Sequence, residues 1–105
     1  MGTQTDWTKV KINPSQTLLT KAELAKLPAL YSQEKVKDPI VLVHYFYGSY
    51  DFWATEFDAE EGLFFGLAHL YETELGNTSA RELASVGRIE RDLYWTPKPL
   101  SQCGV

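Results

Sequence analysis

The sequence is poor in the features that mark disulfide-linked, secreted or membrane-spanning proteins. It has a single cysteine, Cys103, so it can form neither an internal disulfide framework nor a Cys-x-x-Cys pair. It has no run of about 18 apolar residues, the length that a membrane-spanning helix requires. Its first residues lack the basic and apolar regions of a secretory signal. From its 105 residues we expect one domain, in the reducing cytoplasm.

The middle of the chain lacks positive charge. Residues 38–80 contain eight acidic residues and no lysine or arginine, so the flanking segments carry all ten basic residues. Because phosphate binding requires lysine and arginine, this composition argues against direct contact between the middle of the chain and nucleic acid. An acidic surface instead favours a basic partner and accelerates its approach.

Apolar periodicity and turn signals predict four strands and two short helices. Each helix begins at a capping box, Thr20 with Glu23 in the first and Ser79 with Glu82 in the second. Gly66 interrupts the third apolar strand and indicates a bulge or a close approach between backbones. The predicted helices span residues 20–27 and 77–86, and the predicted strands span residues 40–47, 52–58, 63–72 and 88–95.

The order of these elements predicts an α+β fold, with a small antiparallel sheet and two short helices. Three strands follow one another through short turns, which favours a meander of about three strands, and residues 88–95 add a C-terminal strand. We expect a single domain over residues 18–102. Residues 1–17 are polar and are expected to be loosely ordered, and residues 103–105 form a tail.

Side-chain alternation predicts which residues share a face of each strand. In the strand at 52–58, one face would hold Trp53, Thr55 and Phe57, and the other would hold Phe52, Ala54, Glu56 and Asp58. The charges of RIERD (88–92) alternate in sign, so we expect them to pair across strands on a solvent-facing side.

The stretch YDFWATEFDAEEGLFF (50–65) combines aromatic residues with five carboxylates and contains no basic residue. We expect its phenylalanine and tryptophan rings in the core and the nearby tyrosines at the surface, where tyrosine is a frequent interface hot spot. Carboxylates around the tyrosines would tune the approach of a partner. The predicted partner-binding residues are Tyr45, Tyr47, Tyr50, Asp51, Glu56, Asp58, Glu60 and Glu61.

Two catalytic alternatives use residues of the same region. Glu56 and Asp58 lie two positions apart on a strand, a spacing that suits an acid–base pair, although a solvated strand end is the commoner reason for it. His44 and His69 with Glu56 would make a set of two histidines and one carboxylate for a metal, but the cysteine and His-Glu-x-x-His patterns of zinc sites are absent. We therefore predict no catalytic residue, no metal site and no cofactor.

Four fragments, taken in order, resemble an uncharacterised family of small proteins that is classed as a domain of unknown function. The fragments are LLTKAELAKLPALYSQE (18–34), FWATEFD (52–58), FFG (64–66) and GRIERDLYWTPKPLSQ (87–102). The resemblance covers about residues 18–102. Members of that family are typically encoded on plasmids, phages and integrative elements, beside or fused to antirestriction-type and DNA-processing proteins. The resemblance therefore implies a mobile-element cargo protein and transfers no catalytic residue.

The expected function is that of a non-enzymatic protein-binding module. Its specific form would be an acidic inhibitor of a host defence system, of CRISPR or restriction type, that contacts a basic nucleic-acid-binding surface. One alternative is a self-associating accessory module of DNA-processing proteins, which would dimerise through a free strand edge. The other is a small metal-dependent enzyme. We expect no direct contact with nucleic acid or with a membrane.

Overall fold

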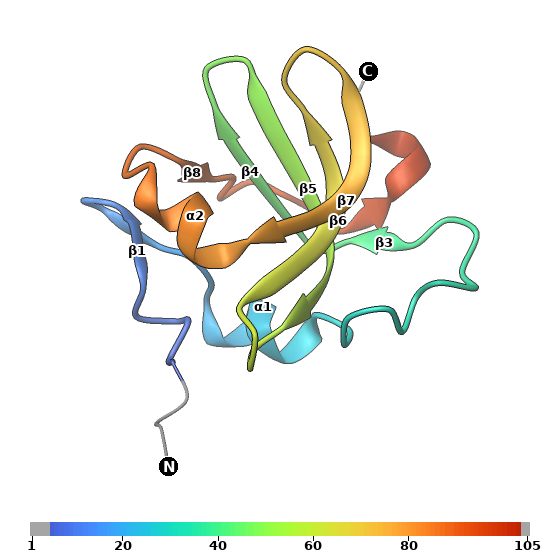
Figure 1. The fold of residues 1–105 in the computed structure, drawn as a ribbon, viewed down its shortest axis with the longest axis horizontal. Coiled ribbons are helices and arrows are strands. Elements are labelled where there is room, and N and C mark those ends of the chain that lie inside the picture. The colour runs from blue at the N-terminus through green and yellow to red at the C-terminus, as the bar shows by residue number, and fades with distance from the viewer. Residues whose placement is uncertain (1–4, 104–105) are drawn as a thin grey trace.

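The computed structural model describes residues 5–103, which form one five-stranded sheet, two two-stranded sheets and two short α-helices (Figure 1). The strands of the large sheet are β4 (Val43–Tyr47), β5 (Tyr50–Asp58), β6 (Leu63–His69), β7 (Thr73–Ser79) and β8 (Glu90–Arg91). The other elements are β1 (Lys11–Asn13), β2 (Gln16–Thr17), α1 (Lys21–Lys26), β3 (Ile40–Val41), α2 (Ala80–Ser85), β9 (Lys98–Pro99) and a 3-10 helix (Leu100–Gln102). The chain therefore has the predicted α+β fold.

The large sheet is antiparallel throughout, in the order β7-β6-β5-β4-β8. The sequence did not predict β7, because residues 73–76 were given no element and residues 77–79 were assigned to the start of the second helix. The predicted strand at 88–95 is reduced to the two residues of β8. β1 pairs with β2, and β3 pairs with β9, in two small antiparallel sheets.

Both helices begin directly after the N-cap residues that the sequence indicated, Thr20 and Ser79, although the second helix was predicted to start at residue 77 and starts at Ala80. The Thr20 hydroxyl accepts a hydrogen bond from the Glu23 backbone N–H (3.1 Å), and the Glu23 carboxylate accepts one from the Thr20 N–H (2.8 Å), which completes the capping box of α1. The Ser79 hydroxyl accepts from the Glu82 N–H (3.2 Å) at the start of α2. These bonds satisfy backbone donors that a helix start leaves unpaired.

The hydrophobic core lies on one face of the large sheet. Tyr45, Phe52 and Phe64 form its aromatic centre, with ring centroids 5.7–6.4 Å apart. Residues 5–17, expected to be loosely ordered, contribute two buried residues to this core, Trp7 and Ile12. The Trp7 indole N–H also donates to the Ala59 carbonyl (2.7 Å). Residues 1–4 of the same segment, and residues 104–105 of the predicted tail, lie outside the described residues.

A β-bulge in β5 changes the predicted alternation. The pairing of β5 with β6 shifts register between Ala54 and Glu56, so Thr55 is the extra residue. Phe57 therefore joins Phe52 on the core face and contacts Phe64, with ring centroids 4.4 Å apart. The expectation that Phe57 shares a face with Trp53 was wrong, because strict alternation does not hold across a bulge.

The β8 edge of the sheet is covered by the hairpin of β1 and β2. The Asn13 side-chain amide donates to the Ile89 carbonyl (2.8 Å), and the Gln16 side chain bonds both the N–H (2.9 Å) and the carbonyl (3.0 Å) of Arg91. Arg91 is buried, and its guanidinium donates to the Thr17 carbonyl and lies 3.5 Å from the Glu23 carboxylate. The prediction that Arg91 pairs on a solvent-facing side is therefore wrong.

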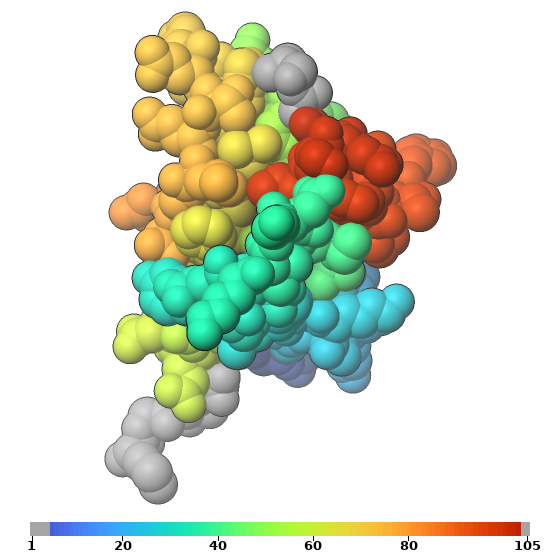
Figure 2. All heavy atoms as spheres, turned by 90° about the vertical axis from the view of Figure 1, so that its right-hand side faces the viewer, coloured from blue at the N-terminus to red at the C-terminus, as the bar shows by residue number. Residues whose placement is uncertain are grey.

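Two segments that are distant in the sequence lie side by side over the other face of the sheet, the connection at 31–39 in teal and the C-terminal segment in red (Figure 2). β3 and β9 join them, the Leu100 N–H donates to the Pro39 carbonyl (2.9 Å), and the Ser101 hydroxyl donates to Asp38 (2.6 Å). The sheet is thus a layer between its core and a covering of connecting segments.

Replacing Gly66 with alanine is expected to destabilise the fold. A Cβ at this position would lie 2.1 Å from the Trp53 carbonyl oxygen and 3.0 Å from the Ala54 Cα, and backbone atoms of a central strand cannot easily move aside. We expect the free energy of unfolding, measured by urea denaturation, to fall by about 1–3 kcal/mol. The matched control is Gly76→Ala, because Gly76 is paired with Gly66 and a Cβ there meets nothing within 4 Å. Equal losses in the two variants would contradict the close approach.

Candidate functional site

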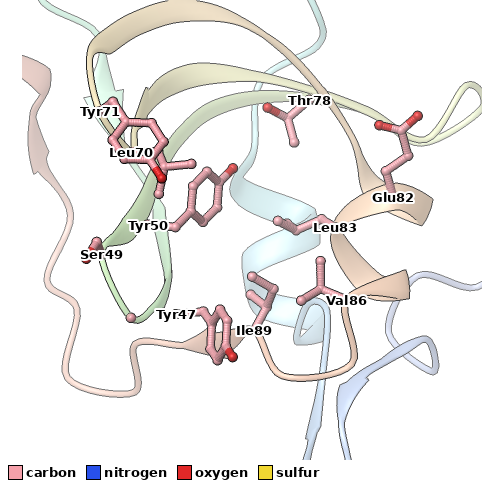
Figure 3. Close-up of a pocket in the computed structure, with 11 residues that line it drawn as sticks. Tyr47, Ser49, Tyr50, Leu70, Tyr71, Thr78, Glu82, Leu83, Val86 and Ile89 are labelled. Atoms are coloured by element: carbon pink, nitrogen blue, oxygen red, sulfur yellow. The ribbon is translucent and has the colours of Figure 1, made fainter.

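The core-facing side of the large sheet is uncovered where β4 turns into β5. Tyr47 and Tyr50 are the last pair of the β4–β5 register, and α2 lies across from them (Figure 3). Between them is a groove of about 680 Å³. We call it the tyrosine groove, and its main lining residues are Tyr47, Tyr50, Leu70, Tyr71, Leu83 and Val86.

Tyr50 is the central side chain of the groove and points into it from β5 (Figure 3). Its partial burial raises the pKa of the phenol, and the nearby Thr78 side chain opposes that rise. Tyr47 is 41% exposed at the rim, where Arg88 donates a long hydrogen bond of 3.4 Å to its hydroxyl. The groove therefore presents phenol rings, each with an apolar body and a polar tip.

A second hollow of about 350 Å³ adjoins the groove, and Tyr50, Leu70 and Tyr71 line both. Its outer side carries Glu72 and Glu74. On the opposite side of the groove, Glu82 projects from α2 (Figure 3). We call Glu72, Glu74 and Glu82 the acidic rim. An apolar floor with tyrosines and charged residues at its margin has the anatomy of a protein interface.

Tyr45 does not belong to this surface, and the expectation that it is exposed is corrected. Its ring is fully buried in the core, and its hydroxyl donates to the Leu18 carbonyl (2.6 Å). On β4, Tyr45 shares a face with Tyr47. Tyr45 lies where that face is covered, and Tyr47 lies where it is open.

Glu56 is also buried rather than exposed, with 3% of its surface accessible. Its carboxylate accepts hydrogen bonds from the backbone N–H groups of Tyr31 and Gln33 (3.2 Å for the latter). Tyr31 has a φ of +65°, a conformation that non-glycine residues rarely adopt. Glu56 therefore anchors the connection between α1 and β3 to the sheet, and it is not available to a partner.

Asp51 is engaged with a histidine. Its Oδ1 lies 2.8 Å from Nε2 of His44, and Nδ1 of His44 lies 3.0 Å from Oδ2 of Asp92. A neutral imidazole has one N–H, so both hydrogen bonds form together only if the ring carries two protons or one carboxyl is protonated. The ring stacks on Trp53 and contacts Trp95, with centroid distances of 5.3 Å in each case. This cluster fastens the segment after β8 to the sheet.

The remaining predicted carboxylates lie at the far end of β5. Asp58 accepts hydrogen bonds from the N–H groups of Glu60 (3.0 Å) and Glu61 (3.3 Å) in the turn to β6. The nine residues of β5 separate this turn from Tyr50 by roughly 26 Å at the usual rise per residue. The structure thus brings Tyr47 and Tyr50 together, and it separates them from Asp58, Glu60 and Glu61.

The three residues considered for a metal site do not converge. His69 is paired with Asp51 near one end of β5, whereas Glu56 is paired with Phe65 near the other end. The His69 ring bonds the Thr73 hydroxyl instead (2.8 Å). Residues 5–103 contain no group of three histidine, cysteine or acidic residues that could hold a metal ion.

Sequence reasoning missed half of the tyrosine groove. Leu83 and Val86 were recognised as helical residues, but nothing local indicated that α2 would face Tyr50. Tyr71 is 91% exposed and stands in the turn between β6 and β7. The sequence signal for this part of the groove was an aromatic residue beside acidic residues in LYETE (70–74). It was overlooked because Leu70 and Tyr71 were assigned to the predicted third strand.

Comparison with known protein families identifies the chain's relatives. Residues 15–103 match the family described as "Protein of unknown function (DUF2958)". The chain belongs to this family. The resemblance drawn from four sequence fragments is thereby confirmed. No curated protein and no solved structure gives a significant match.

The DUF2958 match spans the whole large sheet, the tyrosine groove and the acidic rim. It begins after Trp7 and Ile12, so this member's core includes two residues that precede the matched region. The family description names no activity, and the association with mobile elements stays a prediction. No helix within residues 5–103 is long and apolar enough to cross a membrane.

The variant Glu56→Ala is expected to loosen the connection between α1 and β3. It leaves the N–H groups of Tyr31 and Gln33 without their acceptor, and each unsatisfied group costs about 1–3 kcal/mol if it stays buried. Hydrogen exchange of these two amides should accelerate, and the free energy of unfolding should fall by about 2 kcal/mol. The exposed Glu60→Ala is the control and should change stability by less than about 0.5 kcal/mol. Unchanged exchange at both amides would refute the anchor.

Tyr45 should make stability depend on alkaline pH. Burial raises the pKa of its phenol well above the ordinary value, Glu23 adds to the rise, and Arg91 opposes it. The stabilising contribution is complete below about pH 10 and is lost above it, where the unfolded chain alone releases the proton. Thermal unfolding should therefore show a larger fall in Tm between about pH 9 and pH 11 for the wild type than for Tyr45→Phe. Equal falls would contradict this reasoning.

Proposed function

We propose that the chain is a non-enzymatic protein-binding module whose contact surface is the tyrosine groove. The observation that carries the proposal is the continuation of the core-facing side of the sheet into an open, tyrosine-lined hollow. Concentrated apolar surface of this kind marks interaction sites on soluble domains. Tyrosine is enriched among the residues that dominate binding energy, because its ring gives large contact area at low entropic cost.

The polar groups of the groove support binding rather than chemistry. The described residues that line it include no histidine, cysteine or lysine, and Glu82 is the one carboxylate among them. General acid–base catalysis usually requires a positioned base with a matched partner.

The partner that we propose is a basic protein that handles nucleic acid or acts in host defence, inside the cytoplasm. The absence of lysine and arginine from residues 38–80 supports a basic partner. The association with plasmids and phages that we expect for the family favours the defence context. Inhibition of a CRISPR or restriction system is the specific form of this proposal.

Self-association is a second candidate, favoured by the free edge of β7. β7 ends the strand order of the large sheet, and no other described strand pairs with its outer side. Its seven residues, TELGNTS, include neither lysine nor proline, which commonly protect exposed edges. The β7 strand of a second copy could therefore pair with this edge in an antiparallel arrangement.

Site-specific photo-crosslinking tests the groove as the contact surface. The photoreactive residue p-benzoylphenylalanine would replace Tyr71, which is 91% exposed beside the groove, in protein expressed in bacterial cells that carry defence systems. We expect a crosslink to one reproducible protein. Its yield should fall about tenfold or more when Tyr50→Ala removes the central ring.

The control position is Tyr94, which is 93% exposed and does not line the groove. Equal crosslinking from positions 71 and 94 would reject the groove as the specific surface. A product with the mass of two copies of the chain would favour self-association over an inhibitor.

A further inference from the structure

The free carboxylates of the base-free middle, residues 38–80, and of the helix α2 that follows it fall into two separate groups. Within residues 5–103, four acids of the base-free middle have hydrogen-bonding partners, namely Asp38, Asp51, Glu56 and Asp58. The side chains of the other four acids there, and that of Glu82, have no hydrogen bond or ion pair in the described chain. These five are Glu60 and Glu61 in one turn, and Glu72, Glu74 and Glu82 around the groove.

We propose that the tyrosine groove takes a short partner segment in which a large apolar side chain is flanked on both sides by lysine or arginine. This inference rests on the proposed function and specifies the chemistry of the partner at that site. The apolar side chain would lie against Tyr50, Leu70 and Leu83. The flanking cations would meet Glu82 on one side and Glu72 with Glu74 on the other.

The dimensions of the groove suit a side chain of this size. Its volume of about 680 Å³ lies within the usual range for sites that bury an organic group. Burying one aromatic side chain removes on the order of 150–250 Å² from water. The second hollow continues past Leu70 and Tyr71, so the following residues of a segment have a surface to lie on.

The negative charge of the acidic rim determines which residues can flank the apolar side chain of the partner segment. The three rim carboxylates have no cation bound within the described chain. Of the two arginines nearby, Arg88 donates to the Tyr47 hydroxyl (3.4 Å) and Arg81 to the Thr5 hydroxyl (2.7 Å). A seated apolar group excludes water, and that strengthens attraction between the rim and a cation beside the group. The same rim repels phosphates, so the groove does not suit a nucleic-acid strand.

Binding of short fluorescein-labelled peptides, measured by fluorescence anisotropy, tests this inference. The probes are a peptide with a central Trp-Leu pair between lysines, the same pair between glutamates, and a lysine peptide with glycines in place of the pair. An oligothymidylate is the nucleic-acid probe. We expect the first peptide to bind at least about tenfold more tightly than each of the others, and to weaken as salt rises.

Two charge-reversed variants provide a matched comparison. The double variant Glu72→Lys with Glu74→Lys should weaken binding of the first peptide about tenfold. Glu60→Lys with Glu61→Lys changes the net charge equally in the other turn and should leave binding within about twofold. Both variants should keep the wild-type Tm, which confirms that they fold.

Each outcome separates this inference from the proposed function. Equal binding of the lysine-flanked and glutamate-flanked peptides, both lost in Tyr50→Ala, would overturn the charge requirement and leave the groove as a binding site. Absence of peptide binding with a persistent crosslink at position 71 would overturn the inference alone. Loss of both the peptide binding and the crosslink would overturn both proposals. Tighter binding of the oligothymidylate than of the first peptide would also overturn the inference and identify nucleic acid as the ligand of the groove.

Discussion

The rest of the structure depends on the pairing of β5 with β6. Thr55 is the bulged residue of this pairing and has no opposite residue on β6. Strict alternation would send Phe57 to the face opposite Phe52, and the bulge returns it to the core. The bulge also sets Glu56 against the connection after α1, where its carboxylate receives two backbone N–H groups. One strand thus supplies core rings, an internal anchor and, through Tyr50, the floor of the groove. Small shifts in its register would disturb all three.

Features that depend on near neighbours could be predicted from the sequence. The hydroxyls of Thr20 and Ser79 accept hydrogen bonds from N–H groups three residues away, so each cap depends only on residues within one helical turn. The β-branched and aromatic run at 40–47 fits a pleated sheet regardless of its neighbours. Gly66 indicated either a bulge or a close approach of two backbones, and the structure shows the close approach, to the backbone of Trp53. The α+β class follows from these local signals.

Features that depend on distant segments could not be predicted. Glu56 has the composition of a surface residue, and its burial follows from N–H groups 23 and 25 positions away. Tyr45 resembles Tyr47 in sequence, but distant residues cover Tyr45, whose hydroxyl donates to the Leu18 carbonyl and whose ring packs against Phe64. β7 contains glycine, asparagine and glutamate, which are depleted in strands, so it forms because β6 offers an edge. The groove is likewise lined by residues from β4–β5, from the β6–β7 turn and from α2, and these segments come together only in the folded sheet.

The two edges of the large sheet differ, and that difference limits how copies of the chain could assemble. Side chains of Asn13 and Gln16 occupy the edge at β8, whereas no described strand occupies the edge at β7. A sheet open on both sides can add molecules without end, as fibrils do. With one side closed, pairing of two copies through β7 would use the open edge of each large sheet and leave no such edge for a third copy. The N-terminal hairpin would thus limit any edge-to-edge association of the large sheet to a closed pair.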